Sequence, residues 1–259
     1  MLNDKDLERY ARQAIMPTIG EDGQEKLLAA RVLVVGAGGL GAPVILYLAA
    51  AGIGTITIID DDDISRSDLN RQIIYRDSDV GLSKSRHAAN AASALNPNIH
   101  ISQLAIRLRS GNVEQLVTAH DVVIDCTDNA ETRYLLGDAA HHCSRPLVFG
   151  GAVRMEGQIS VFQSSVKGYL GSPCYRCVFP AMPDTRHVPG CSEAGILGPV
   201  VGLVGTLQAL ETIKLILGQP RTLTCRLLLI EGAGSDFIEI QTVTRLDCSC
   251  CGKPAKEMR

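Results

Sequence analysis

Two pairs of cysteines with the same spacing are the residues of this chain whose chemistry is easiest to assign. Cys174 and Cys177 form one C-x-x-C sequence, and Cys248 and Cys251 form a second one. Four thiolates from two such turns are the tetrahedral ligand set of structural zinc. The sequence therefore predicts a zinc site that ties the C-terminal segment to an earlier loop. Cys250 is an alternative fourth ligand, although the two-residue spacing favours Cys251.

A glycine-rich segment is the second feature with a chemical meaning. Gly36-Ala37-Gly38-Gly39-Leu40-Gly41 follows an apolar, β-branched run and opens a segment of good helix formers. Glycine lets the backbone approach a phosphate closely, and the free N–H groups at the start of a helix face the anion. Asp60 ends the next apolar run, where a carboxylate can hydrogen-bond a ribose. These residues predict a nucleotide site; the alternative is a tight strand-to-helix turn without a ligand.

Basic residues further along the chain favour ATP over NAD as the nucleotide. Arg71 lies in the segment Ser67–Gln72, and Lys84 ends the segment Gly81–Lys84. We expect both segments near the carboxyl ends of strands, where open α/β sheets bind their ligands. Attack on an α-phosphorus needs such cations, whereas hydride transfer does not. Each of the two taken alone is also compatible with a solvated surface cation.

A polar pair, Asp128 and Asn129, follows the fourth predicted strand. A carboxylate at this place can hold Mg²⁺ against phosphate oxygens. Asp128 is also a suitable N-cap for the helix that follows, and one residue can serve both purposes. We predict that Asp128 binds magnesium.

A lone cysteine, Cys191, lies in the glycine- and proline-rich segment Val188–Gly195. A thiolate in a loop is a candidate nucleophile, because it attacks activated carbonyl groups readily. The alternative is an inert thiol. The other single cysteines lie in or beside strand and helix patterns, and we expect them to be small buried apolar residues. They are Cys126, Cys143 and Cys225.

Strand and helix patterns alternate over the first 150 residues. This alternation predicts a Rossmann-like α/β fold, in which a mostly parallel sheet carries helices on both faces. The expected strands are 32–35, 55–59, 99–104, 122–124 and 147–149, and the expected helices are 40–51, 84–95, 113–119 and 130–142.

The pattern changes after residue 150. A strand is expected over 158–163, and a long loop rich in glycine, proline and cysteine over 167–195. A long apolar helix is expected over 200–217, and a hairpin over 223–230 and 236–243. The second half therefore predicts an antiparallel continuation of the sheet that ends in the zinc-bound segment.

The composition limits the classes of function. The chain has 259 residues, a net charge of −3, 4% aromatic residues and no tryptophan, so we expect no nucleic-acid partner. The polar segment Met1–Tyr10 does not resemble a secretory signal. The uncharged stretch Ala194–Leu210 contains glycines and a proline, and we interpret it as buried rather than membrane-spanning. Together with the nine cysteines, these features predict a cytoplasmic protein whose thiols bind metal or do chemistry.

The motifs, taken in their order, resemble the E1-like ThiF/MoeB/HesA family of sulfur-carrier protein adenylyltransferases. The resemblance covers nearly the whole chain. It rests on Arg9–Gln13, Gly36–Gly41, Asp60–Asp62, Leu69–Gln72, Asp125–Asn129, Arg154–Gln158, Cys174–Cys177, Gly205–Ala209 and Cys251-Gly252. It implies one E1-like adenylation domain over 1–259, with an N-terminal helical segment (1–30), a nucleotide-binding half (31–150) and a carrier-binding and zinc half (151–259).

The resemblance also implies roles for single residues. Asp60 would hold the ribose, Asp128 would hold Mg²⁺, and the quartet of cysteines would hold zinc. Arg12 would reach the active site of the second subunit of a homodimer, and Cys191 matches a loop cysteine of the family. The residues expected to bind the nucleotide, with Gly39 against the phosphates, are Gly36, Gly38, Gly39, Gly41, Asp60, Asp62, Ser67, Asn70, Arg71, Gln72, Lys84, Asp128 and Asn129.

The reaction that the resemblance implies is carboxylate activation by ATP. The C-terminal glycine carboxylate of a small ubiquitin-fold sulfur carrier ending in Gly-Gly attacks the α-phosphorus, which gives an acyl-adenylate and pyrophosphate. A sulfur donor then yields the thiocarboxylate. The chain has no rhodanese-like extension, so we expect a separate donor, either a cysteine desulfurase or a rhodanese. The motifs match both the molybdenum cofactor and the thiamine branches, with the former slightly ahead.

Three other functions fit parts of the sequence. An NAD-dependent oxidoreductase would use the same glycine loop. A tRNA-modifying E1-like dehydratase would share the fold, but the cysteine quartet and the lack of a basic surplus argue against it. A non-catalytic scaffold would bind the ubiquitin-fold partner without adenylating it.

Overall fold

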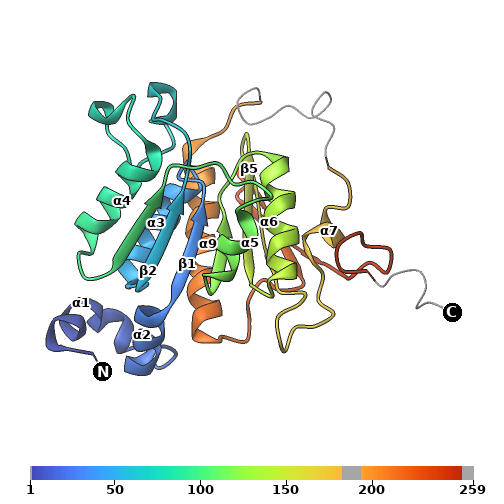
Figure 1. The fold of residues 1–259 in the computed structure, drawn as a ribbon, viewed down its shortest axis with the longest axis horizontal. Coiled ribbons are helices and arrows are strands. Elements are labelled where there is room, and N and C mark those ends of the chain that lie inside the picture. Colours follow the sequence, from blue (N-terminus) through green and yellow to red (C-terminus); the bar gives the residue numbers. More distant parts are fainter. Residues whose placement is uncertain (1, 183–193, 253–259) are drawn as a thin grey trace.

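The computed structural model describes residues 2–182 and 194–252, which form one continuous eight-stranded sheet (Figure 1). Its strand order is β3-β2-β1-β4-β5-β6-β7-β8. The first five strands pair in parallel and the last three add to them antiparallel. The strands are β1 (Arg31–Val35), β2 (Thr55–Ile59), β3 (His100–Leu104), β4 (Val122–Asp125), β5 (Leu147–Val153), β6 (Glu156–Phe162), β7 (Arg226–Glu231) and β8 (Asp236–Gln241).

Helices cover both faces of the parallel part because its central strands are apolar on both sides. Val34 lies between Ile58 and Ile124 in register and faces the same side as they do. On this side lie α3 (Gly41–Ala51), α4 (Lys84–Leu95) and α9 (Gly198–Leu217). On the other side lie α5 (Val113–Thr118), α6 (Ala130–His142) and the short α7 (Tyr175–Val178).

Two further helices precede the sheet. These are α1 (Asp4–Ala14) and α2 (Gly20–Ala29), and they lie at the amino end of β1 (Figure 1). Asn3 caps α1, because its side chain accepts from the N–H groups of Lys5 and Asp6. Two 3₁₀ helices, η1 (Arg66–Asp68) and η2 (Asp77–Asp79), follow β2.

Helix α9 is the one helix among the described residues that is long and apolar enough to cross a membrane. It packs against α3, β4, β5 and β6. The contact with α3 is close, since a side chain at Gly205 would collide with the carbonyl oxygen of Leu40. The buried side of α9 also carries Gln208 and Thr212, whose polar groups are hydrogen-bonded within the protein. These contacts agree with the interpretation of this stretch as a core helix.

The predicted fold class is confirmed, and most elements begin and end within two residues of their expected bounds. The largest differences lie after residue 147. Strand β5 extends to Val153 because it pairs along its whole length with β6. Strand β7 begins at Arg226 rather than at residue 223, since Cys225 has a left-handed backbone (φ 61°) that interrupts the extended run. The division into halves at residue 150 stays a prediction.

Candidate nucleotide and metal sites

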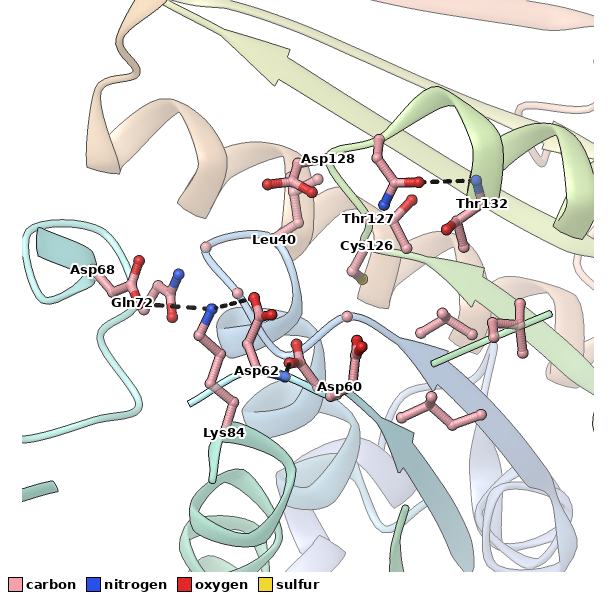
Figure 2. A pocket seen from close by; sticks show the side chains of 18 of the residues that line it. Leu40, Asp60, Asp62, Asp68, Gln72, Lys84, Cys126, Thr127, Asp128 and Thr132 are labelled. Atoms are coloured by element: carbon pink, nitrogen blue, oxygen red, sulfur yellow. Dashed lines mark hydrogen bonds and ion pairs between the residues drawn. The ribbon is translucent and has the colours of Figure 1, made fainter. Parts of the chain in front are cut away.

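A cavity of about 360 Å³ opens at the carboxyl ends of β1, β2 and β4 (Figure 2). The strand order changes direction between β1 and β4, and ligands of open α/β sheets bind at such a point. The predicted site residues that line the cavity are Gly36, Gly38, Gly39, Asp60, Asp62, Arg71, Gln72, Lys84, Asp128 and Asn129. The structure therefore brings together segments that lie more than 90 residues apart in the sequence.

The glycine loop has its shape because two of its positions accept no side chain. Gly36 has a positive φ of 96°, and a Cβ there would lie 2.6 Å from the carbonyl oxygen of Cys126. A Cβ at Gly41 would collide with the carbonyl oxygen of Gly36. Gly38 is different, since its nearest neighbour would be the Gln72 side chain at 3.5 Å. Gly41 thus maintains the turn and does not line the cavity, whereas Gly36, Gly38 and Gly39 do.

Asp60 links the end of β2 to the glycine loop. Its carboxylate accepts hydrogen bonds from the backbone N–H groups of Ala37 (2.7 Å) and Asp62 (2.9 Å). Burial raises the pKa of Asp60 above its usual value, although these two hydrogen bonds act in the opposite direction. The carboxylate is fixed at the cavity wall, where a ribose hydroxyl pair can reach it.

Two cations face the cavity and are held by carboxylates. The Lys84 ammonium lies 2.9 Å from Asp62 Oδ2 and 3.6 Å from Asp68 Oδ2. Burial lowers the pKa of Lys84, but the hydrogen bond to Asp62 and the charges of Asp60 and Asp68 outweigh burial and raise it overall. The Arg71 guanidinium lies 3.1 Å from Asp68 Oδ1. The Lys84 ammonium is therefore charged at neutral pH.

The loop after β4 presents Asp128 to solvent at the cavity. Asn129, rather than Asp128, caps α6, because its side chain accepts from the N–H of Thr132 at 2.9 Å. Buried Asp125 stabilises the loop: its Oδ1 accepts from the N–H (3.0 Å) and the hydroxyl (2.7 Å) of Thr127. Burial raises the pKa of Asp125. The Asp128 carboxylate is thus exposed, close to the glycine loop and able to ligate a cation.

Some predicted site residues lie outside the cavity wall. Ser67 and Asn70 are exposed and touch the site through Arg71, whose Nη1 donates to Ser67 O (2.9 Å) and Asn70 Oδ1 (3.1 Å). Arg12 is exposed near the end of α1 and does not line the cavity of its own chain. Cys191 lies outside the described residues.

Other residues line the cavity that the sequence did not single out. Arg133 lies one turn into α6; its Nη2 donates to Thr127 O (2.7 Å) and its guanidinium lies over the Phe149 ring. A basic residue in the first turn after Asp128-Asn129 could have marked it. Apolar wall residues leave no such signal, because they resemble ordinary core residues. They include Val35, Ile59, Ile106 and Leu108.

The four paired cysteines converge at the far side of α6. Sγ atoms of Cys174, Cys177, Cys248 and Cys251 all lie within 4.8 Å of one another. Neighbouring sulfurs are 3.8 Å (Cys174–Cys177), 3.5 Å (Cys174–Cys248) and 3.3 Å (Cys177–Cys251) apart. A convergent set of four thiols fits a tetrahedral thiophilic ion such as zinc. Cys250 packs against the same cysteines but is not one of the four whose sulfurs converge, so the spacing argument for Cys251 agrees with the geometry.

Helix α6 connects the two sites. It begins at the cavity with Asn129, and its Asp138 forms a two-point ion pair with Arg176 of α7 (2.6 and 2.7 Å). Gly137 lets α7 approach closely, since a Cβ there would lie 2.7 Å from Cβ of Tyr175. Cys174 and Cys177 lie on either side of this contact, and the C-terminal segment returns to them (Figure 1).

The fold and the cavity define an α/β protein with a candidate ligand site where its strand order reverses, an antiparallel extension and a candidate metal site. The chain belongs to the ThiF family, whose model matches residues 10–251.

Named relatives agree with this family. The chain is 45% identical over 251 residues to an adenylyltransferase and sulfurtransferase MOCS3 of Aedes aegypti, covering 96% of this chain and 56% of that protein. It thus spans little more than half the length of this relative. It is 41% identical over 249 residues to a sulfur carrier protein adenylyltransferase of Thermus thermophilus, covering 96% of this chain and 92% of that one.

A solved structure shares the fold. The crystal structure of E. coli MccB with MccA-N7isoASN superposes with a TM-score of 0.81 at 21% identity, covering 97% of this chain and 76% of that one. The predicted Rossmann-like sheet with its antiparallel continuation therefore has a known counterpart.

Proposed function

We propose that this protein uses ATP to adenylate the C-terminal glycine carboxylate of a small ubiquitin-fold sulfur carrier that ends in Gly-Gly. The observation that carries the proposal is the convergence of Arg71, Lys84 and Asp128 on the cavity that the glycine loop borders. A cavity for NAD would need no such cations. The names of the relatives, which are adenylyltransferases, support the same class of reaction.

The cavity suggests how ATP is oriented. The triphosphate lies along Gly38 and Gly39 with Arg71 and Lys84 beside it, and the ribose reaches Asp60. The base then enters the apolar side of the cavity, which Ile106 and Leu108 line. The α-phosphorus is left facing the loop that carries Asp128.

The chemistry places little covalent work on the protein. The carrier's carboxylate attacks the α-phosphorus in line, the bond to the β-phosphate oxygen breaks, and pyrophosphate leaves. Positioning and fixed positive charge supply most of the acceleration. Arg71 and Lys84 stabilise the charge that develops on the phosphates. The Asp128 carboxylate would hold Mg²⁺, whose charge would screen the phosphate oxygens from the incoming carboxylate.

A second copy of the chain completes the site. Arg12 is exposed and distant from the cavity lining of its own chain, as expected for a cation that acts in a partner's site. Exposed apolar side chains on α3 and α9, namely Tyr47, Leu203 and Leu210, suit contact with such a copy. We therefore propose a homodimer in which each Arg12 enters the other active site.

The quartet of cysteines holds zinc in a structural role. Three of its four members are buried, and four thiolates complete a tetrahedral ligand set. The ion would tie residues 248–252 to α7 and stabilise the antiparallel half.

Sulfur transfer follows adenylation. A separate cysteine desulfurase or rhodanese supplies the sulfur. Cys191 forms either an acyl intermediate, by displacing AMP from the acyl-adenylate, or a persulfide-linked one, by taking the outer sulfur of the donor's persulfide while the donor's cysteine leaves as a thiolate. The carrier belongs to molybdenum cofactor or thiamine biosynthesis, and the enzyme acts in the cytoplasm without nucleic acid or membrane.

Carrier-dependent exchange of pyrophosphate into ATP tests the proposal. We expect exchange with an intact Gly-Gly carrier and none when its last glycine is removed. No exchange with candidate carriers of both pathways would refute the proposal, and reduction of NAD by the same protein would favour an oxidoreductase.

The dimer has its own test, because two inactive variants can complement each other. Arg12→Ala and Arg71→Ala are each expected to be inactive. A co-refolded equal mixture has one intact site in every mixed dimer, so about one quarter of wild-type activity should return. No recovery in a mixture shown to contain mixed dimers would place Arg12 outside the partner's site.

A further inference from the structure

Arg71 and Lys84 come from different elements and share one carboxylate. Arg71 follows η1, whereas Lys84 is the first residue of α4. Asp68 Oδ1 lies 3.1 Å from Arg71 Nη2, and Asp68 Oδ2 lies 3.6 Å from Lys84 Nζ. The two cations of the cavity are therefore joined through a single side chain.

Asp68 is itself rigidly placed. Only 10% of its side chain is exposed, and its Oδ2 also accepts from the N–H of Ser65 at 3.0 Å. Its carbonyl oxygen accepts from the N–H groups of Arg71 (3.0 Å) and Gln72 (2.9 Å), which fixes the turn after η1. A buried carboxylate with two cations and a backbone donor has no favourable alternative position.

Asp62, the second partner of Lys84, is placed very differently. Its Oδ2 lies 2.9 Å from Lys84 Nζ, but 68% of its side chain is exposed (Figure 2). An ion pair with such a partner contributes little, and its carboxylate can turn into water. An incoming triphosphate can therefore replace Asp62 at Lys84 but cannot replace Asp68.

We propose that Asp68 is a positioning residue that keeps Arg71 and Lys84 directed at the triphosphate, whereas Asp62 is the exchangeable anion that Lys84 releases when ATP binds. This inference rests on the proposed adenylation.

The physical benefit is preorganisation of two flexible side chains. Free arginine and lysine side chains each sample many rotamers, and fixing them during the reaction would cost rate. Asp68 fixes both before ATP arrives. Two cations and one carboxylate still carry a net positive charge, so the triad attracts the triphosphate once Asp62 has turned away.

Asparagine variants at the two positions should have opposite effects. Asp68→Asn is expected to lower kcat/KM for ATP in carrier-dependent exchange about 100-fold, with part of the loss in kcat, because both cations lose their anchor. Asp62→Asn is expected to lower the KM for ATP about two- to fivefold, since ATP no longer competes with an exposed anion. Asp77→Asn is the matched control. Asp77 pairs with Arg66 at 3.2 Å on the exposed surface outside the cavity, and neither constant should change.

The pH profile separates positioning from a merely structural role. The charged groups around Lys84 are Asp60, Asp62 and Asp68, with Arg71 beyond Asp68. The three carboxylates raise the pKa of Lys84, so Asp68→Asn should move the alkaline limb of the activity profile to lower pH. A loss of folded protein alone would reduce the amplitude and leave the limb in place. Asp68→Glu keeps the charge, and we expect it to keep the limb near wild type even if Asp68→Asn folds poorly.

Three results would overturn the inference. They are wild-type kinetics in Asp68→Asn, an unshifted alkaline limb in that variant, or a higher KM for ATP in Asp62→Asn. If wild type shows no exchange with any carrier, adenylation fails as a function. Calorimetric binding of Mg-ATP still decides the inference, with weaker binding expected for Asp68→Asn and tighter binding for Asp62→Asn. Absence of Mg-ATP binding by wild type would overturn both.

Discussion

The nucleotide cavity and the cysteine quartet hold their side chains in opposite ways. At the cavity, Asp62 and Asp128 are exposed, and Lys84 is shared between an exposed and a buried carboxylate. In the quartet, Cys174, Cys177 and Cys248 are each less than 10% exposed and face one another. The first arrangement allows partners to be exchanged, and the second excludes exchange.

The difference shows that the cysteine quartet is held more rigidly than the charged side chains of the cavity. Long-range charge pairs with exposed members cost little to break, so a substrate can take their place. Four converging thiols, three of them buried, lose much if one is removed, because an ion then has an incomplete ligand set. Substitutions at the cavity should therefore change activity more than stability, and substitutions in the quartet should do the reverse.

The largest effect is expected at Asp128. Asp128→Asn should lower carrier-dependent pyrophosphate exchange about 1,000-fold, because the variant cannot neutralise the phosphates through a bound cation. Its melting temperature should stay close to wild type, since the side chain is exposed and does not cap α6. A large fall in melting temperature would show that the loop depends on Asp128 for its structure and would weaken the contrast.

The quartet should respond in the opposite sense. Cys174→Ser is expected to lose the bound metal and to lower the melting temperature on the order of 10 °C, while residual exchange activity at low temperature persists. Cys143→Ser is the control, because that thiol lies outside the quartet. Metal analysis and calorimetry provide the measurements, and a metal-free wild type would remove the zinc proposal.

A substitution at Tyr75 should have a smaller effect, and it should change both stability and activity. The buried Tyr75 hydroxyl lies 2.7 Å from Ala37 O and 3.1 Å from Lys84 O, so it joins the glycine loop to the start of α4. Tyr75→Phe should lower stability by about 1–2 kcal/mol and raise the KM for ATP a few-fold. Thermal unfolding and exchange kinetics measure the two effects. Tyr169→Phe, at a partly exposed ring, should change neither.

The stability contributed by Lys84 should depend on pH in a defined direction. Its carboxylate partners hold its pKa above the usual 10.5, so the stabilisation is complete below pH 10.5 and is lost as pH rises through the higher folded-state value. The difference in melting temperature between wild type and Lys84→Met should be constant from about pH 7 to 10 and should shrink above that. A difference that shrinks already near neutral pH would contradict the raised pKa.

The smallest effect is expected at Cys250, which packs against the quartet but is not one of its four convergent thiols. Cys250→Ser should keep one metal per chain and a melting temperature within about 2 °C of wild type, as for most substitutions outside a ligand set. Loss of metal in this variant would make Cys250 a ligand in place of Cys251.

Local signals in the sequence predicted the fold well. Helix α4 has the expected bounds, 84 and 95; in the structure Ser83 caps its start and Asn96 its end. The spacing of the cysteines predicted their convergence. The sequence alone does not decide which residue caps α6, because the adjacent Asp128 and Asn129 are both good caps. The backbone path selects Asn129.

The sequence predicted less well the features that depend on contacts between residues far apart in the chain. Asp68 pairs with both Arg71 and Lys84. Lys84 follows Asp68 only after η2, so no local pattern in the sequence indicates the second ion pair. The extension of β5 to Val153 depends on pairing with β6, whose register lies outside any local pattern. Arg12 is exposed in the single chain, so its place in the site of a second subunit stays a prediction.

Gly137 couples the cavity and the cysteine quartet, because it lies in α6 where α7 packs closely against that helix. Because nothing larger than hydrogen fits between α6 and the Tyr175 ring, an alanine there would push α7 outward and carry two cysteines with it. Helix α6 itself begins at the cavity, where Asn129 caps it. A substitution at position 137 would therefore disturb the cysteine quartet and the loop after β4 together.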